Sequence, residues 1–223
     1  MTARSLAART RQLIAALQKQ YGRPRAPVRK DPLSELVFTI LSQNTSDLNR
    51  DRAWASLWKA FGSWDEIASA SQPKLEDAIR VGGLAPTKSR VIQQVLREVK
   101  ARENAHSLDR LRAMGMQEVE SYLAGFKGVG LKTIRCVQVF SLGQPAFPVD
   151  THIFRVTKRL GLLPASATPA RAHQALGEAT PPDEVLPFHM NLIRHGREIC
   201  KAGRPLCEEC VLRAGCRHGK RAG

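Results

Sequence analysis

Apolar residues recur along most of this chain of 223 residues at the spacing of helices with one buried face. One run follows the i, i+3, i+4, i+7, i+8 pattern and consists of Leu33, Leu36, Val37, Ile40 and Leu41. The same spacing recurs later at Ile92, Val95, Leu96 and Val99, and again at Ile153, Val156 and Leu160. The alternation that is typical of strands, bounded by turn dipeptides, is missing from the sequence. The pattern therefore predicts an all-α fold.

Helix starts and one connector divide this pattern. Residues that commonly begin a helix, a capping side chain or an early proline, occur at Ser71-Gln72-Pro73, Asp109 and Thr168-Pro169. Residues 143–148, Gly-Gln-Pro-Ala-Phe-Pro, separate two helical stretches. We therefore expect one helical domain before this connector and a second one after it. The sequence leaves open which of them the first 27 residues join.

The charge of the chain favours a polyanionic partner. Thirty-five Lys and Arg residues against 20 Asp and Glu give a formal net charge of +15, and each phosphate that a cation neutralises releases condensed counterions. A solvated basic protein is the alternative. No apolar run is long enough to span a bilayer, and residues 1–11 lack the features of a signal peptide. We expect a cytoplasmic protein associated with the nucleoid, without a membrane partner.

Four of the five cysteines form a compact motif, Cys200-x6-Cys207-x2-Cys210-x5-Cys216. Without a secretory signal, metal binding explains them better than disulfides do. Structural zinc sites usually combine two Cys-x2–4-Cys knuckles, whereas this segment has one knuckle between two single cysteines. The spacing therefore favours a [4Fe–4S] cluster and leaves zinc open. His218 is a further candidate ligand, although four cysteines already complete either site.

The two cations between the motif cysteines and the fifth cysteine of the chain are interpreted separately from the metal site. Lys201 and Arg204 lie between the first two motif cysteines, where a rigid loop would present them to phosphate; solvated surface cations are the alternative. Cys136 lies on an apolar helix face, which is typical of a small buried hydrophobe.

Residues 121–134 read as two helical segments joined by Gly128-Val129-Gly130. Such a turn exposes backbone N–H groups next to a helix N-terminus, and these groups can bind a phosphate. Taken alone, a Gly-x-Gly sequence is most often only a turn.

Three segments together resemble the endonuclease III family. Residues 126–133, Phe-Lys-Gly-Val-Gly-Leu-Lys-Thr, resemble the family's hairpin, and residues 148–156, Pro-Val-Asp-Thr-His-Ile-Phe-Arg-Val, resemble its second signature. His195-Gly196-Arg197 and the cysteine motif follow in the family's order, so the resemblance covers roughly the C-terminal half. Weaker likeness extends through residues 41–47 and 83–88.

The resemblance implies a two-domain helix-hairpin-helix DNA glycosylase fold with a [4Fe–4S] cluster loop. A six-helix domain would contain residues 28–145, with its hairpin at about 121–134. An N- and C-terminal helical domain would combine residues 1–27 and 146–223 and hold the cluster at 200–216.

Two residues match the family's catalytic positions. Lys132 falls on the nucleophilic lysine, whose amine attacks the sugar C1′, displaces the base and forms a Schiff base from which β-elimination cuts the strand. A phosphate-binding surface lysine is the alternative. Asp150 falls on the catalytic carboxylate and also fits the N-cap of a helix that begins at Thr151; the two roles are compatible. His152 either supports this site or packs in the first turn.

A base that leaves the stack leaves a gap for protein side chains to fill. Leu84 matches a family position for an apolar wedge, and a core leucine at a helix end is an equal alternative. Asn44 aligns where the family commonly has a glutamine that fills the gap on the opposite strand; asparagine is shorter.

The resemblance implies a monomeric enzyme of base excision repair that acts on damaged double-stranded DNA. We expect a bifunctional DNA N-glycosylase and AP lyase for oxidised pyrimidines of the thymine glycol type. One alternative is a relative that acts mainly on abasic sites or on uracil or thymine mismatches; another is a non-catalytic, cluster-bearing DNA-binding protein. Phe126-Lys127 replaces the family's usual Leu-Pro, which bears on substrate range.

Overall fold

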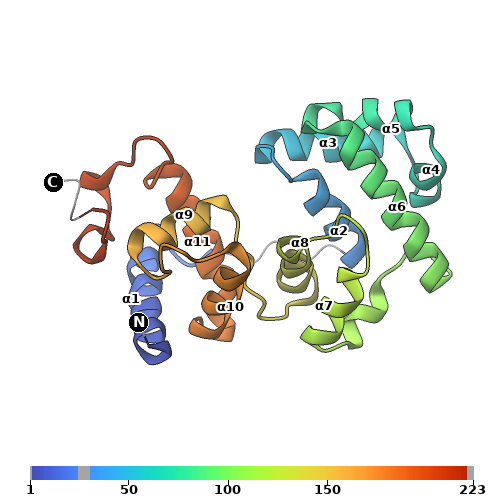
Figure 1. Cartoon of the computed structure of the whole chain (residues 1–223). Helices are drawn as coiled ribbons and strands as arrows, with labels where there is room; N and C mark the ends of the chain where they lie inside the picture. Colours follow the sequence, from blue (N-terminus) through green and yellow to red (C-terminus); the bar gives the residue numbers. More distant parts are fainter. Residues whose placement is uncertain (1, 25–30, 220–223) are drawn as a thin grey trace. The chain divides into compact units, whose positions relative to one another are not determined.

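The structure, a computed structural model, describes residues 2–24 and 31–219. All regular secondary structure in these ranges is helical (Figure 1). The prediction of an all-α fold is confirmed. The chain divides into two compact units, unit 1 with Met1–Val28 and Gln144–Gly223, and unit 2 with Arg29–Gly143. Among the described residues, no helix has both the length and the apolar character that spanning a membrane requires.

Unit 2 contains seven α-helices and three shorter helical segments among its described residues. In chain order they are α2 (Pro32–Leu41), α3 (Asp47–Ala60), α4 (Trp64–Ser69), α5 (Gln72–Ile79), η1 (Arg80–Gly82), α6 (Ala85–Glu103), η2 (Asp109–Ala113), α7 (Met116–Ala124), α8 (Leu131–Cys136) and η3 (Val137–Leu142). The η3 segment is π-helical and directly continues α8.

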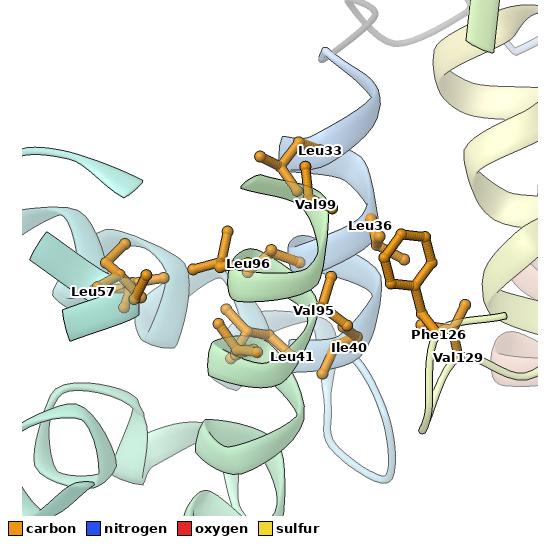
Figure 2. Packing of buried hydrophobic residues seen from close by; sticks show 14 of the residues in the cluster. Leu33, Leu36, Ile40, Leu41, Leu57, Val95, Leu96, Val99, Phe126 and Val129 are labelled. Atoms are coloured by element: carbon orange, nitrogen blue, oxygen red, sulfur yellow. The ribbon is translucent and has the colours of Figure 1, made fainter. Parts of the chain in front are cut away.

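The core of unit 2 forms around α2. Its apolar face lies between α6, which contributes Val95 and Leu96, and the hairpin residue Phe126 (Figure 2). Leu36 and Ile40 of α2 are completely buried there. Each such side chain contributes roughly 1.5–3 kcal/mol through removal of its apolar surface from water. The helical spacing of the apolar residues therefore fixes which face of α2 meets α6 and the hairpin.

Two of the three predicted helix starts begin α-helices. Ser71 precedes α5, and the Thr168 side chain accepts a hydrogen bond from the Arg171 N–H at the start of α10. Asp109 is the first residue of the short 3-10 segment η2 and not of an α-helix. This segment ends at Ala113, since the next residue, Met114, has extended backbone.

Unit 1 combines the first helix with the C-terminal part of the chain. It contains α1 (Ala3–Tyr21), α9 (Thr151–Leu160), α10 (Pro169–Ala179), η4 (Pro182–Glu184), α11 (Val185–Glu198), η5 (Cys207–Glu209) and η6 (Arg213–Gly215). Helix α1 packs against α10 and α11 through its buried residues Leu13, Ile14 and Leu17. The N-terminal helix thus joins the unit that carries the cysteine motif.

Candidate functional site

The hairpin between α7 and α8 is held by its own apolar side chains. Phe126 and Val129 are only 1% and 8% exposed and point into the core of unit 2 (Figure 2). The guanidinium of Arg102 lies 4.2 Å from the centre of the Phe126 ring, a cation–π contact. Lys127 and Gly128 are exposed. The Phe126-Lys127 pair therefore supplies one buried hairpin residue and one exposed cation.

Both the backbone conformation at position 128 and the side chain packed against it require a glycine there. Its φ of +88° lies in the left-handed region, and a Cβ there would lie 2.9 Å from both methyl groups of Val91. The turn also uses the N–H of Val129, which donates to the carbonyl of Phe126 at 3.1 Å. That N–H is therefore occupied in this structure, whereas Gly128 and Gly130 are exposed; phosphate contacts by Gly128, Val129 and Gly130 stay a prediction.

Lys132 is the second residue of α8 and is partly exposed. Its Nζ lies 3.5 Å from the hydroxyl oxygen of Ser42, directly after α2. The Ser42 hydroxyl itself donates to the carbonyl of Thr39 at 2.7 Å, so its lone pairs are left for the amine. The amine of Lys132, the predicted nucleophile, thus has an uncharged hydrogen-bond acceptor as its neighbour. The distance between Nζ and the hydroxyl oxygen is long for a hydrogen bond, so the amine is free to move.

Two exposed loops of unit 2 carry the predicted gap-filling residues. Asn44 and Leu84 have φ values of +49° and +53°, which only a few per cent of non-glycine residues adopt. Leu84 is 53% exposed, so the alternative of a core leucine is wrong. It lies after Gly83, whose φ of +69° also departs from helical backbone, and directly before α6.

Asp150 in unit 1 is the N-cap of α9, as its sequence context predicts. Its Oδ1 accepts a hydrogen bond of 2.7 Å from the N–H of Ile153. This bond uses one carboxylate oxygen and leaves the other one available. Asp150 belongs to unit 1 and Lys132 to unit 2.

Two buried histidines hold the segment that leads to Asp150. The Nδ1 of His189 lies 3.0 Å from the carbonyl of Pro148, and the N–H of Val149 donates to Nδ1 of His173 at 3.2 Å. Sequence reasoning missed both residues. Their only signal is a histidine on an otherwise apolar helix face, far along the chain from the residue that it positions.

His152 packs between helices. A guanidinium nitrogen of Arg155 lies 3.2 Å from its Nδ1. A Cβ at Gly196 of α11 would lie 3.0 Å from the Cβ of His152. The His-Gly-Arg sequence on α11 therefore provides the close approach of α9 and α11.

All four cysteines of the motif line one cavity. Cys200, Cys207, Cys210 and Cys216 line it, together with His218 and other residues. All four are free thiols. Burial, with the nearby thiols adding to it, raises the pKa of the Cys210 thiol. Metal ligation requires the thiolate form, so a bound cation would have to compensate the charge that burial disfavours at Cys210.

Arginines of α9 hold the loop around this cavity, residues 199–219, which we call the cysteine segment. Arg159 donates to the carbonyls of Lys201 and Ala202 at 2.6 and 2.8 Å, and it lies 3.4 Å from the sulfur of Cys200. Arg155 donates to the carbonyl of Cys200 at 3.0 Å. These contacts fix the backbone of the segment, while the side chains of Lys201 and Arg204 stay exposed.

The donor set of the cysteine segment consists of four thiols on one cavity. Within the described residues, no three His, Cys, Asp or Glu side chains are arranged to hold one metal ion. Tetrahedral zinc with Zn–S bonds of 2.3 Å needs sulfurs about 3.8 Å apart, whereas a [4Fe–4S] cluster has a wider body whose four irons each take one thiolate. Four cysteines supply the number of thiolates that either centre needs.

Comparison with known proteins assigns the chain to a family. Residues 37–182 match the model of the HhH-GPD superfamily of base excision DNA repair proteins. Endonuclease III of Thermotoga maritima is 32% identical over 200 residues, which cover 90% of this chain and 89% of that protein. Endonuclease III of Sulfolobus acidocaldarius is 32% identical over 191 residues, covering 85% and 83%. The chain belongs to the HhH-GPD superfamily and, within it, to the endonuclease III family.

Other matches agree with this assignment. A candidate DNA glycosylase of Arabidopsis thaliana is 39% identical over 75% of this chain, which spans 57% of that longer protein. A trapped covalent endonuclease III–DNA intermediate matches all of this chain with a TM-score of 0.83 and 27% identity. A thermostable thymine-DNA glycosylase shares the fold, with a TM-score of 0.77 and 18% identity. The chain is accordingly a base excision DNA repair glycosylase of the endonuclease III type.

Proposed function

We propose that the chain is a bifunctional DNA N-glycosylase and AP lyase that removes oxidised pyrimidines of the thymine glycol type. The observation that carries this proposal is the amine of Lys132, which is partly exposed on the hairpin helix and has a serine hydroxyl as its neighbour. A lysine needed only for stability would gain more from a carboxylate partner. Family membership leaves no reason to retain the non-catalytic alternative.

The chemistry uses a free amine and an ionised carboxylate. The Nζ of Lys132 attacks C1′, the C1′–N bond to the base breaks, and the base leaves with its bonding electrons and takes up a proton. The amine loses a proton, the C1′–O4′ bond breaks with O4′ taking up a proton, and a protonated Schiff base forms at C1′. Loss of a C2′ proton then expels the 3′-phosphate and cuts the strand. Asp150, oriented by its cap bond to Ile153, stabilises positive charge at C1′ and transfers protons.

Borohydride trapping tests this proposal. We expect wild-type protein to form a covalent adduct with duplexes that contain thymine glycol or an abasic site, and Lys132→Ala to lose at least 10³-fold in trapping rate. Lys59→Ala is the control, because it removes an exposed lysine of the same unit, in α3. It should still trap fully. A wild-type protein that traps on neither substrate would refute the lyase mechanism.

The same assay distinguishes oxidised pyrimidines from the alternative substrates, which are abasic sites and uracil or thymine mismatches. Trapping on abasic duplexes but not on thymine glycol would identify a relative that acts mainly as an AP lyase. Uracil and thymine mismatches extend the panel. The exposed Lys127, which replaces the family's usual proline, is the feature that favours a changed substrate range.

We also propose that Cys200, Cys207, Cys210 and Cys216 bind a [4Fe–4S] cluster. The cluster supplies no step of base removal; it fixes the cysteine segment through four bonds to thiolate. Anaerobically purified protein should contain four iron and four sulfide per chain, and Cys207→Ser should lose both. A colourless protein with stoichiometric zinc would contradict the proposal.

The exposed cations Lys201 and Arg204 are proposed to contact DNA phosphates, together with Gly128 and Gly130 of the hairpin. Removing one phosphate contact should reduce the slope of log K against log salt by about 0.9. Duplex binding by Lys201→Ala and Arg204→Ala, measured over a salt series, tests each residue separately. An unchanged slope of log K against log salt would mean that this side chain contacts solvent and not a phosphate. Asn44 and Leu84 are proposed to enter the gap that the flipped base leaves.

A further inference from the structure

Lys88 of α6 is a buried cation that has no charged partner among the described residues, 2–24 and 31–219. It is 2% exposed and is among the largest side chains buried in the protein. Its Nζ donates to two backbone carbonyls, those of Leu41 at 2.7 Å and Gly82 at 2.8 Å. Burial lowers the pKa of its amine, and no neighbouring charge contributes to this shift. A buried cation that is paired only with neutral carbonyls is costly.

Simple stability does not explain this lysine. It lies in the first turns of α6, where the positive end of the helix dipole disfavours a cation. A methionine would fill the same space without the cost of desolvating a charge. The two carbonyls are therefore the feature that requires a lysine at this position.

Both carbonyls belong to residues that end an element just before a candidate DNA-inserting loop. Leu41 is the last residue of α2, and the loop that follows it carries Asn44. Gly82 is the last residue of η1, and Leu84 follows two residues later. The backbone N–H of Lys88 also donates to the carbonyl of Leu84 at 2.9 Å. Lys88 thus contacts the backbone on both sides of the Leu84 loop and at the base of the Asn44 loop.

Gly82 has little freedom to move away from this contact. A Cβ on it would lie 3.0 Å from the Cβ of Ala53 in α3, so its backbone packs closely against that helix. The loop residues beyond the two carbonyls have left-handed backbone, at Asn44 and Leu84. Such conformations persist only where surrounding contacts determine them.

We propose that Lys88 is a positioning residue that holds the Asn44 loop and the Leu84 loop in one fixed arrangement, so that both side chains enter damaged DNA as a preorganised pair. This inference rests on the proposed gap-filling role of Asn44 and Leu84. A fixed pair pays less entropy on insertion than two independently mobile loops do. Lys88 itself touches neither DNA nor the reacting atoms.

Binding to a duplex with a tetrahydrofuran abasic analogue, with 2-aminopurine as the opposite base, tests the proposal. We expect Lys88→Met to weaken binding about tenfold and to reduce the 2-aminopurine signal of unstacking. Lys59→Met is the control, since it removes one positive charge from an exposed position, and should change binding less than twofold. Cleavage of a single-stranded abasic oligonucleotide, which has no opposite base, should stay within twofold of wild type for both variants.

A mutant cycle separates positioning from general destabilisation. In an Asn44→Ala/Leu84→Ala background, Lys88→Met should cause no further loss of duplex binding, because nothing remains to be positioned. Lys88→Gln, which keeps an amide donor, is measured in both backgrounds alongside it and carries the test if Lys88→Met does not fold. Equal losses in both backgrounds, or no loss in either, would overturn the inference. Failure of the proposed function is distinct, because wild-type protein would then not trap on abasic DNA at all.

Discussion

The hairpin and the cysteine segment are held by different forces, although both are proposed to meet DNA. The hairpin keeps its shape through buried apolar residues, among them Phe126, Val129 and Ile134. In the cysteine segment, residues 199–219, Leu212 and Cys216 are the only buried hydrophobic side chains. Its backbone is fixed instead by Arg155 and Arg159. The first surface is determined by packing, and the second depends on polar contacts and on the cluster that it is proposed to bind.

The largest expected effect comes from removing the proposed cluster from the cysteine segment. Structural metals contribute on the order of 10 kcal/mol to small domains, and this segment has little apolar burial to replace them. Hydrogen exchange on holo and metal-stripped protein should show loss of protection at residues 199–219, with the hairpin unchanged. Retained protection in the stripped protein would show that Arg155 and Arg159 suffice.

Phe126→Ala should have the next largest effect. It leaves a cavity in the core and removes the Arg102 contact, so we expect a loss of about 3–5 kcal/mol in the free energy of unfolding. Urea denaturation measures it. The control in the cysteine segment is Val211→Ala, whose side chain is 45% exposed and which should change stability by less than about 0.5 kcal/mol. Similar losses in the free energy of unfolding for the two variants would mean that apolar packing does not distinguish the hairpin from the cysteine segment.

A pair of glycine substitutions sharpens the comparison. Gly128→Ala meets the Val91 methyl groups at 2.9 Å and keeps an unfavourable φ, so we expect it to cost about 1–3 kcal/mol. Gly203→Ala in the cysteine segment has nothing within 4 Å of its Cβ and should be close to neutral. Thermal unfolding of both variants provides the test, and a neutral Gly128→Ala would mean that the hairpin moves readily.

The smallest effect is a pH dependence that arises beside the hairpin. Burial, with a hydrogen bond to Glu103, raises the pKa of Tyr122 in α7 from 10.0 to about 12. Because the folded pKa is the higher one, the neutral tyrosine stabilises the fold fully below pH 10, and this contribution is lost as the pH rises from 10 to 12. Allowing for partial exposure, we expect a loss of roughly 1–2 kcal/mol. Denaturant titrations at a series of pH values should show it, and Tyr122→Phe should abolish it.

Local signals in the sequence predicted the parts of the molecule that local physics determines. The apolar spacing gave α2 its buried face, and Asp150 occupies the cap position that its context indicates. Cys136 is buried, 3% exposed, as its apolar helix face predicts. Each of these features depends on residues a few positions apart.

Features that depend on distant contacts could not be predicted in this way. Lysine is ordinarily a surface residue, and nothing near Lys88 in the sequence indicates that carbonyls of two other elements surround its amine. His173 and His189 position the segment before Asp150 from helices further along the chain. The sequence likewise left Leu84 between two alternatives, because its exposure is decided by how η1 and α6 meet.

The discontinuous composition of unit 1 has a consequence for synthesis. Helix α1 is translated before the other elements of both units, yet the faces of α10 and α11 that cover Leu13, Ile14 and Leu17 are translated roughly 150 residues later. All of unit 2 is made in between and can fold as it emerges. Helix α1 thus stays without its partners until the C-terminal part of unit 1 has been made.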